Sequence, residues 1–449
     1  MSDHITNYEE AVELFYRIPR FNKNHKLQSI ERVLTRMGQP DRQMKIVHIA
    51  GTNGKGSTSA YLAGLLEKSG CKTGLFTSPH LVDIRERFVI DGKMVSKELF
   101  TEAVGAVCSL LETLKREGET YEPCFFDMLF FVGMYVFAKE RVEIVVLETG
   151  LGGRLDATNA VQQKDLTLIT HIALDHTEYL GTTLQEIALE KAGIMRPNIP
   201  CIVAPKNDMV RDVFLKKAEE LGSKCRVLGE RDYACQGVYE KSVAFSYFSS
   251  YYGTVPVRLH TPALYQADNV CLALAGFEML IELGIVRKEQ MSVELLKQTL
   301  WETGWAGRME EVCRNVFLDG AHNTDGMHMF LESVREDDCI GNRTVIFSAV
   351  SDKDYKQMLA DVIESGLFSK IIVTQLATER GVDVMRLYEE AEKKIKSSMT
   401  KMECCFMPEI SEAVLEVIEK RTSKEYIYIV GSLYLVGQMK QLLEQYRTV

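Results

Sequence analysis

The sequence predicts an α/β fold with a mostly parallel sheet and two domains, and three observations predict it. An apolar strand runs into a glycine-rich turn and then a helix near residue 51. Further apolar runs alternate with helical patterns, which is typical of parallel strands that are covered on both faces. The same alternation restarts after residue 308, and 449 residues exceed one ordinary core.

In the first domain we expect a strand at 46–50, a helix over the following residues to about 70, and a short strand at 74–76. Three runs with nearly unbroken apolarity predict further strands at 142–148, 165–172 and 199–205. Helical spacing of apolar residues predicts helices at 97–117, 126–140, 183–195 and 266–284. The aromatic and β-branched stretch at 243–259 predicts a hairpin or edge strands.

The second domain is expected to be a smaller Rossmann-like unit. Strands are predicted at 315–319, 343–350, 370–375 and 425–432, with helices between them. We place the boundary near 295–308 and predict domains at 1–298 and 299–449. The second domain has no G-x-G-x-x-G fingerprint, so dinucleotide binding is not indicated.

Composition excludes several classes of protein. The formal net charge of −10 argues against nucleic acid as the main partner. The eleven cysteines are scattered without a C-x-x-C motif, which favours a reducing cytoplasm. The acidic N-terminus is unlike a signal peptide, and the longest apolar run, 128–138, is too short to span a membrane. We therefore expect a cytoplasmic protein without a membrane or nucleic-acid partner.

The run GTNGKGST at 51–58 predicts a phosphate-binding loop. Its glycines let the backbone approach an anion, and the amides and dipole at the helix N-terminus favour negative charge. Lys55 can reach terminal phosphates, and Ser57 or Thr58 can offer a hydroxyl to Mg²⁺. The loop departs from G-x-x-x-x-G-K-[ST] at Ile49 and Gly56. A plain glycine turn with a solvated lysine is the alternative. The predicted nucleotide contacts of the loop are Thr52, Asn53, Gly54, Lys55, Gly56, Ser57 and Thr58.

Two strand ends supply candidate metal ligands. Glu148 ends a buried strand, where an acid opposite a phosphate loop could hold Mg²⁺; a solvent-facing glutamate is the alternative. Asp175 and His176 follow another strand, and the acid–histidine pair favours a functional role for His176. We expect His171 to be structural.

Residue type alone says less about five other positions. It favours a surface salt bridge for Lys191, and for Ser78 a helix cap or turn is as plausible as a site role. Arg308 is either a surface charge or a phosphate clamp. Asp319 ends a strand of the second domain, and a small-residue turn with His322 follows it.

Taken together, these motifs resemble the Mur ligase superfamily and, within it, the folylpolyglutamate synthase and dihydrofolate synthase family. Each motif is weak to moderate alone, but their common order along nearly the whole chain is specific. The matching segments are GTNGKGST (51–58), TSPHLVDIRERF (77–88), ETGLGGRLDATN (148–159), LDHTEYLG (174–181), EKAGI (190–194), QADN (266–269), WAGRME (305–310), LDGAHN (318–323), SDKD (351–354) and GSLYLVG (431–437).

The resemblance implies a Mur-ligase-type ATPase domain and a C-terminal ligase domain. In this chemistry ATP phosphorylates a substrate carboxylate, and the amine of L-glutamate attacks the acyl phosphate to form an amide. The resemblance implies one Mg²⁺ at Ser78 and Glu148 and a second at Glu148 and His176. Lys191 matches a lysine that the family carbamylates, which would give the second metal an oxygen ligand.

The remaining roles come from the same resemblance. Lys55, His176, Lys191 and Arg308 are the expected catalytic residues. Asn269, Arg308 and Asp319 resemble further ATP contacts, and His322 would lie near ribose or phosphate. The pterin-side pocket is expected to include Cys124, Phe125, Phe126, Asp127, Leu155, Asp156 and Ala157. The family often has glutamate where this chain has Asp127.

We expect an ATP-dependent ligase that adds L-glutamate to the γ-carboxylate of folyl-glutamates. Sole or additional dihydrofolate synthase activity, with dihydropteroate as acceptor, is the first alternative. A cell-wall Mur ligase is less expected because the phosphate loop begins at residue 51, too early for a preceding UDP-substrate domain. A switch-type NTPase would leave Arg308 and Asp319 without a purpose, and a non-catalytic binding protein would not need Lys55, Glu148 and His176. A monomer is expected.

Overall fold

The computed structural model describes residues 5–20, 26–337, 340–398, 400–420, 422 and 424–443. The chain forms two compact units, neither of which is one continuous stretch. Unit 1 comprises residues 1–233, 247–255 and 268–303, and unit 2 comprises residues 234–246, 256–267 and 304–449. The α/β class predicted from the sequence is confirmed in both units, whereas the boundary at 298/299 stays a prediction.

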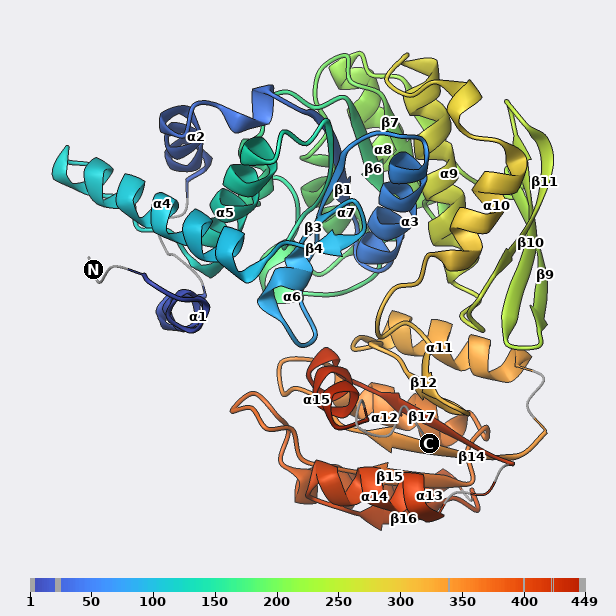
Figure 1. Cartoon of the computed structure of the whole chain (residues 1–449). Coiled ribbons are helices and arrows are strands. Elements are labelled where there is room, and N and C mark those ends of the chain that lie inside the picture. Colours follow the sequence, from blue (N-terminus) through green and yellow to red (C-terminus); the bar gives the residue numbers. More distant parts are fainter. Residues whose placement is uncertain are drawn as a thin grey trace. The chain divides into compact units, whose positions relative to one another are not determined.

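Unit 1 is built on an eight-stranded, mostly parallel sheet with the order β4-β3-β2-β5-β1-β6-β7-β8 (Figure 1). Six of these strands pair in parallel, namely β2, β5, β1, β6, β7 and β8. The strands β3 and β4 add an antiparallel edge. The strands are β1 (Lys45–Ala50), β2 (Thr73–Phe76), β3 (Phe88–Ile90), β4 (Lys93–Met94), β5 (Ile144–Glu148), β6 (Leu166–Ile169), β7 (Cys201–Val203) and β8 (Cys225–Val227). The central strands β1, β5 and β6 are buried except for Lys45 at the start of β1, as their apolar runs predicted.

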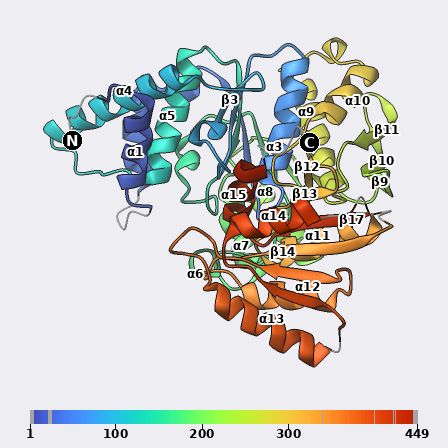
Figure 2. The same ribbon diagram turned by 60° about the horizontal axis from the view of Figure 1, so that its bottom comes forward.

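Helices cover both faces of this sheet. On one face, α3 and α9 meet strand β6, where Gly276 lies against Leu168 and Leu62. The other face carries two apolar cores, one under α1, α2, α4 and α5 and one under α7 and α8. Figures 1 and 2 show α1, α4 and α5 side by side, and Phe15 of α1 stacks on Phe100 of α4. The helices are α1 (Tyr8–Arg17), α2 (Leu27–Arg36), α3 (Lys55–Lys68), α4 (Lys97–Arg116), α5 (Phe125–Lys139), α6 (Thr177–Leu180), α7 (Leu184–Ala192), α8 (Asp208–Leu221), α9 (Gln266–Glu282) and α10 (Val293–Glu302).

A three-stranded sheet follows α8, with the order β11-β10-β9. Its strands are β9 (Tyr233–Tyr239), β10 (Ser242–Ser249) and β11 (Gly253–Leu259). The prediction of a hairpin or edge strands at 243–259 is confirmed as the neighbouring pair β10 and β11, and β9 was not predicted. Each of the three strands contributes residues to both units.

Unit 2 contains a six-stranded sheet with the order β12-β13-β17-β14-β15-β16, parallel except for the β12–β13 pair. One face packs against α11, α12 and α13, and Figure 2 shows α14 and α15 on the other side. The strands are β12 (Glu310–Cys313), β13 (Val316–Leu318), β14 (Asn342–Phe347), β15 (Lys370–Val373), β16 (Glu403–Phe406) and β17 (Glu425–Val430). The helices are α11 (Thr324–Glu336), α12 (Tyr355–Glu364), α13 (Val384–Ser398), α14 (Ile410–Lys420) and α15 (Leu433–Leu443). The short edge strands β12 and β16 were not predicted.

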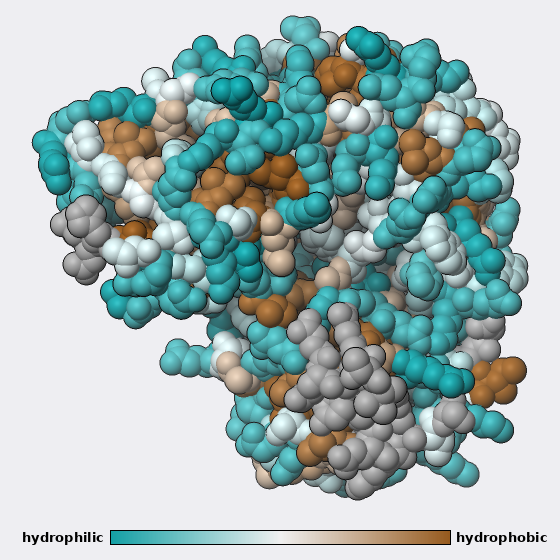
Figure 3. All heavy atoms as spheres, in the orientation of Figure 1, coloured by the Kyte–Doolittle hydropathy of each residue, from teal (hydrophilic) through white to brown (hydrophobic). Residues whose placement is uncertain are grey.

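The molecular face drawn in Figure 3 is mainly hydrophilic, with hydrophobic side chains in small groups. Among the described residues, no helix combines the length and the apolar character needed to cross a membrane.

Candidate active site

The predicted site residues of unit 1 follow the carboxyl ends of neighbouring parallel strands. The phosphate loop follows β1, Ser78 follows β2, and the glycine-rich loop at 149–156 follows β5, which ends in Glu148. Since β2, β5, β1 and β6 lie side by side and run in parallel, these segments leave the sheet at one edge. Ligands of open α/β sheets bind at that edge.

Close backbone contacts explain two glycines of the phosphate loop. A Cβ on Gly51 would lie 1.7 Å from Thr170 Oγ1, and a Cβ on Gly54 would lie 2.1 Å from Asn269 Oδ1. Gly54 also has a φ of +89°, which side chains disfavour. The Thr170 hydroxyl donates to Asn53 O at 2.7 Å. The loop is therefore fixed from β6 and α9 in a form that only glycine permits.

The start of α3 presents polar groups that suit a phosphate. Gly54 is the N-cap and gives no side-chain cap to the first helical amides. The Ser57 hydroxyl is buried and has no hydrogen-bond partner among the described residues. Lys55 Nζ donates to Thr52 O at 3.1 Å, so the ammonium lies over the loop. Amides, a hydroxyl and a cation thus converge on an anion-binding helix end.

Glu148 and Ser78 are direct neighbours. The Ser78 amide donates to Glu148 Oε2 at 3.0 Å, and the Glu148 side chain is buried. Within the described part of the chain, no group of three His, Cys, Asp or Glu residues could hold a metal ion. Mg²⁺ in phosphate sites commonly takes one or two carboxylates, with water and phosphate oxygens as its other ligands. A buried carboxylate next to the phosphate loop, held by the Ser78 amide, therefore fits such an ion.

His176 begins α6 with a left-handed backbone, φ 50° and ψ 41°. This conformation is uncommon outside glycine and is concentrated at functional sites. Its Nε2 lies 3.9 Å from Asp175 Oδ2, and the His176 side chain is 41% exposed. The imidazole is therefore open to solvent next to a buried carboxylate.

Lys191 lies in the last turn of α7 and is buried. Its Nζ donates to the phosphate loop at Gly51 O, 2.7 Å away. Burial is the main cause that lowers the Lys191 pKa to about 7, and the positive charge of Lys55 lowers it further. The surface salt bridge that residue type alone favours is wrong, since the side chain is inside the protein.

The predicted pterin-side segment at 124–127 contacts the glycine-rich loop that leads to Leu155. A Cβ on Gly150 would lie within 2.5 Å of the Phe126 ring, so α5 packs on the glycine-rich loop. Asp127 accepts hydrogen bonds from the Cys124 amide at 2.9 Å and from the Tyr121 hydroxyl at 2.8 Å. These bonds cap α5 and fix where its first turn begins.

The side chain of Asp156 is directed into its own loop. It accepts bonds from the amides of Gly150, Leu151 and Thr158 at 2.8–3.0 Å. Leu155 is 53% exposed, while Ala157 is buried. Asp156 therefore shapes the loop, and Leu155 is the member of this predicted group that faces solvent.

Unit 2 brings Arg308, Asp319 and His322 together after β13. Asp319 accepts bonds from the Tyr265 hydroxyl at 2.5 Å and from the Met309 and Ala321 amides at 3.0 and 2.8 Å. A Cβ on Gly320 would lie 2.1 Å from Arg308 Nη1, so Arg308 crosses directly over this turn. His322 Nδ1 donates to Gly320 O at 2.8 Å.

Comparison with known proteins assigns the family. The family model of the Mur ligase middle domain matches residues 49–276, and that of the Mur ligase, glutamate ligase domain matches residues 307–433. The dihydrofolate synthase/folylpolyglutamate synthase of Bacillus subtilis is 30% identical over 447 residues, which cover 98% of this chain and all of that protein. The chain belongs to the dihydrofolate synthase/folylpolyglutamate synthase family of Mur ligases.

Solved structures of this family share the fold. The apo form of L. casei FPGS (folylpolyglutamate synthase) superposes with a TM-score of 0.84 at 25% identity and covers 98% of this chain and 100% of that chain. An FPGS–AMPPCP–folate complex gives a TM-score of 0.82 at 26% identity, again over 98% and 100% of the two chains. The family resemblance inferred from the motifs is therefore confirmed.

Several residues that shape the site of this family member were missed from the sequence. Thr170 supports the phosphate loop, and Lys164 and Arg196 bind the end of the glycine-rich loop. Thr170 lies one residue beyond the end of β6, where a hydroxyl could have been suspected. Lys164 follows two glutamines and resembles an ordinary surface loop, so no sequence signal pointed to it.

Proposed function

We propose that this protein is an ATP-dependent ligase that adds L-glutamate to the γ-carboxylate of tetrahydrofolyl-glutamates and so forms folylpolyglutamates. The observation that carries the proposal is the phosphate loop beside Glu148 and Ser78, in a chain that aligns over its length with a dihydrofolate synthase/folylpolyglutamate synthase. A folate and an ATP analogue are named together in the FPGS–AMPPCP–folate complex, which supports the same substrates for this chain.

In the proposed reaction the substrate carboxylate attacks the γ-phosphorus of ATP, which releases ADP and gives an acyl phosphate. The amine of L-glutamate then attacks the acyl carbon, phosphate leaves, and an amide forms. The protein's task is to position charged groups and neutralise them. The loop amides and Lys55 would hold the β- and γ-phosphates, and Asn269, Arg308, Asp319 and His322 would supply further contacts to ATP.

Two Mg²⁺ ions belong to the proposal. Ser78 and Glu148 would hold one, and Glu148, His176 and Lys191 the other. Bound Mg²⁺ would neutralise charge on the transferred phosphoryl group. Lys191 would serve as a ligand after its neutral amine adds CO₂ and loses a proton, which converts it to a carbamate. The buried amine, with its pKa lowered to about 7, supports this reading.

The pterin would lie along the glycine-rich loop and the first turn of α5. Leu155, Asp156, Ala157 and the segment 124–127 are the proposed pterin-side residues. The packing of Phe126 on Gly150 supports one shared pocket wall. Dihydropteroate could be a second acceptor in the same site. The Bacillus subtilis relative is a dihydrofolate synthase/folylpolyglutamate synthase, which favours testing this acceptor.

The enzyme is proposed to act as a monomer in the cytoplasm. Cysteines of the described residues carry free thiols, which suits a reducing compartment. Light scattering of the purified protein would test the oligomeric state directly.

The deciding experiment is phosphate release from ATP with Mg²⁺, with and without L-glutamate, and with tetrahydrofolyl-glutamate, dihydropteroate or neither. The proposal expects release that requires both glutamate and a pterin, and the pterin that works names the activity. Lys55→Ala, measured in parallel, controls for a contaminating ATPase. Release that is indifferent to glutamate and pterin would overturn the proposal in favour of a switch-type NTPase.

A further inference from the structure

The end of helix α7 is tied to the glycine-rich loop by a cluster of polar groups within unit 1. The Arg154 amide donates to Glu190 O at 2.8 Å. Asn159 Nδ2 donates to Arg154 O at 3.0 Å and to Gly193 O at 3.1 Å. Two carbonyls at the end of α7, Glu190 O and Gly193 O, are thus bonded by the segment that follows Glu148.

A buried lysine and a partly buried arginine complete this junction. Lys164 Nζ donates to Asn159 Oδ1 at 2.7 Å and to Ile194 O at 3.0 Å. Arg196 donates through Nη2 to Asn159 Oδ1 at 2.9 Å and through Nη1 to Gly193 O at 3.1 Å. Asn159 Oδ1 therefore accepts from both cations while its Nδ2 donates to two carbonyls. We call Asn159, Lys164 and Arg196 the loop clamp.

The charge of the clamp is unusual for a buried site. Neither Lys164 nor Arg196 forms an ion pair with a carboxylate of the described residues. Burial lowers the Lys164 pKa well below its ordinary value, with the charge of Arg196 as the second cause. The negative end of the α7 dipole offsets part of this cost. A fold that only needed to fill this space could do so with apolar side chains.

A second chain of bonds orders the same loop from strand β1. His48 Nε2 lies 2.8 Å from Thr158 Oγ1, and the Thr158 hydroxyl donates to Asp156 Oδ1 at 2.5 Å. Because that hydroxyl has one hydrogen, it accepts from His48. Residues 154–159 are thus held at both ends, with Leu155 exposed between them.

We propose that Lys164 and Arg196 are positioning residues for the pterin substrate, because they hold the loop 154–159 against the end of α7 and so fix the wall that carries Leu155. This inference rests on the proposed function for the identity of the ligand. Neither cation need touch the substrate. Thr170 and Asn269 hold the phosphate loop in addition to Lys191 of α7, so ATP binding should depend on the clamp much less than pterin binding does.

The test is Lys164→Met, which keeps the length of the side chain and removes its donors and charge. We expect the KM for the pterin substrate to rise about tenfold while the KM for ATP stays within about twofold. Lys164→Arg, which keeps a cation with several donors, should recover part of the loss. If Lys164→Met does not fold, Arg196→Lys supplies the same comparison, since it keeps the charge and loses the forked geometry.

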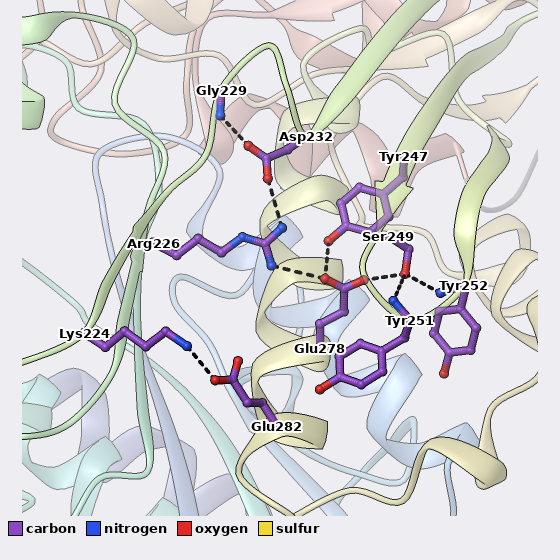
Figure 4. A network of polar contacts seen from close by, with 10 residues as sticks. All are labelled: Lys224, Arg226, Gly229, Asp232, Tyr247, Ser249, Tyr251, Tyr252, Glu278 and Glu282. Carbon is purple, nitrogen blue, oxygen red and sulfur yellow. Dashed lines mark hydrogen bonds and ion pairs between the residues drawn. The ribbon is translucent and has the colours of Figure 1, made fainter.

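Arg226→Met is the matched control. Arg226 is a partly buried cation of unit 1 that binds Glu278 and Asp232, and none of these residues belongs to the proposed site (Figure 4). Its loss should lower the melting temperature without changing the KM for the pterin. A Lys164→Met enzyme that behaves in the same way, less stable but with an unchanged pterin KM, would overturn the inference.

Equilibrium binding separates this inference from the proposed function. Titration of dihydropteroate or tetrahydrofolyl-glutamate into wild type and Lys164→Met needs no turnover. Wild type that binds a pterin but does not release phosphate would reject the proposed reaction, and the Kd ratio would still decide the role of the clamp. Wild type that binds neither pterin would overturn both.

Discussion

Unit 1 holds a partly buried arginine and a buried lysine in opposite ways. In the network around Glu278, Arg226 lies between two carboxylates, at 3.1 Å from Glu278 and 2.9 Å from Asp232 (Figure 4). These partners raise the Arg226 pKa despite its burial. Lys191 instead donates to a backbone carbonyl, and burial lowers its pKa to about 7.

This is the difference expected between a structural charge and the reactive role proposed for Lys191. The Tyr247 and Ser249 hydroxyls also donate to Glu278, at 3.0 and 2.5 Å, so the acceptor capacity of that carboxylate is well used. A satisfied network of this kind stabilises one conformation. A lysine that is buried without a bonded carboxylate gives up its charge more easily, as at many functional sites.

The largest effect is expected at the proposed metal ligand Glu148. Glu148→Gln keeps the shape of the side chain and its bond from the Ser78 amide but removes the negative charge. We expect kcat for ligation to fall about 10³-fold, because both proposed Mg²⁺ sites would lose a charged ligand. Glutamate-dependent phosphate release measures it. Glu282→Gln, at an exposed glutamate, is the control, and near-normal turnover in Glu148→Gln would remove this carboxylate from the site.

The next largest effect is expected on stability, at the ion pair of Arg226 and Glu278. Arg226→Met leaves the buried Glu278 carboxylate without its cation, and we expect about 3 kcal/mol of lost unfolding free energy. Urea denaturation measures it. Lys224→Met in the exposed pair with Glu282 should cost less than about 1 kcal/mol. Equal costs for the two variants would mean that burial of Glu278 does not set the value of its ion pair.

A smaller effect on turnover is expected at Lys191 and tests its proposed role as a metal ligand. We expect Lys191→Ala to lower turnover about 10²-fold, and short carboxylates such as formate to restore part of it by replacing the proposed carbamate oxygens. Isotope-labelled bicarbonate and carbon NMR would detect the carbamate in wild type. Full activity of Lys191→Ala without added carboxylate would show that the lysine is buried for structural reasons only.

The smallest effect concerns pH and His48. Burial is the main cause that lowers the His48 pKa well below its unfolded value of 6.5, and the charges of Lys164 and Arg196 lower it further. The unfolded chain then binds the proton more tightly, so this contribution to stability is full above pH 6.5 and declines as the pH falls. We expect the decline to be about 1 kcal/mol per pH unit at most. His48→Gln should weaken the pH dependence of the urea midpoint between pH 6.5 and 5. The same pH dependence in the variant and the wild type would show that His48 is not the titrating group.

The sequence predicted the parts of the structure that local chemistry determines. The glycines at 51 and 54 and the carboxylate at the end of β5 could be read directly, because a turn and a parallel strand each leave a local pattern. The loop clamp could not be predicted, since Asn159, Lys164 and Arg196 meet only after β6 and α7 have formed. The edge strands β12 (EEVC) and β16 (ECCF) carry charged and partly exposed residues, so they lack the unbroken apolar runs that predicted the other strands.

The route of the chain between the units limits how the protein can be dissected. Residues 256–267 belong to unit 2, where the Leu264 amide donates to Ser333 Oγ at 3.1 Å and Ala263 joins the apolar core. A fragment that starts at residue 304 would lack these groups and the Tyr265 hydroxyl that binds Asp319. Neither half can therefore be produced intact by a single cut in the gene, and a permuted or split version would need its new ends within one unit.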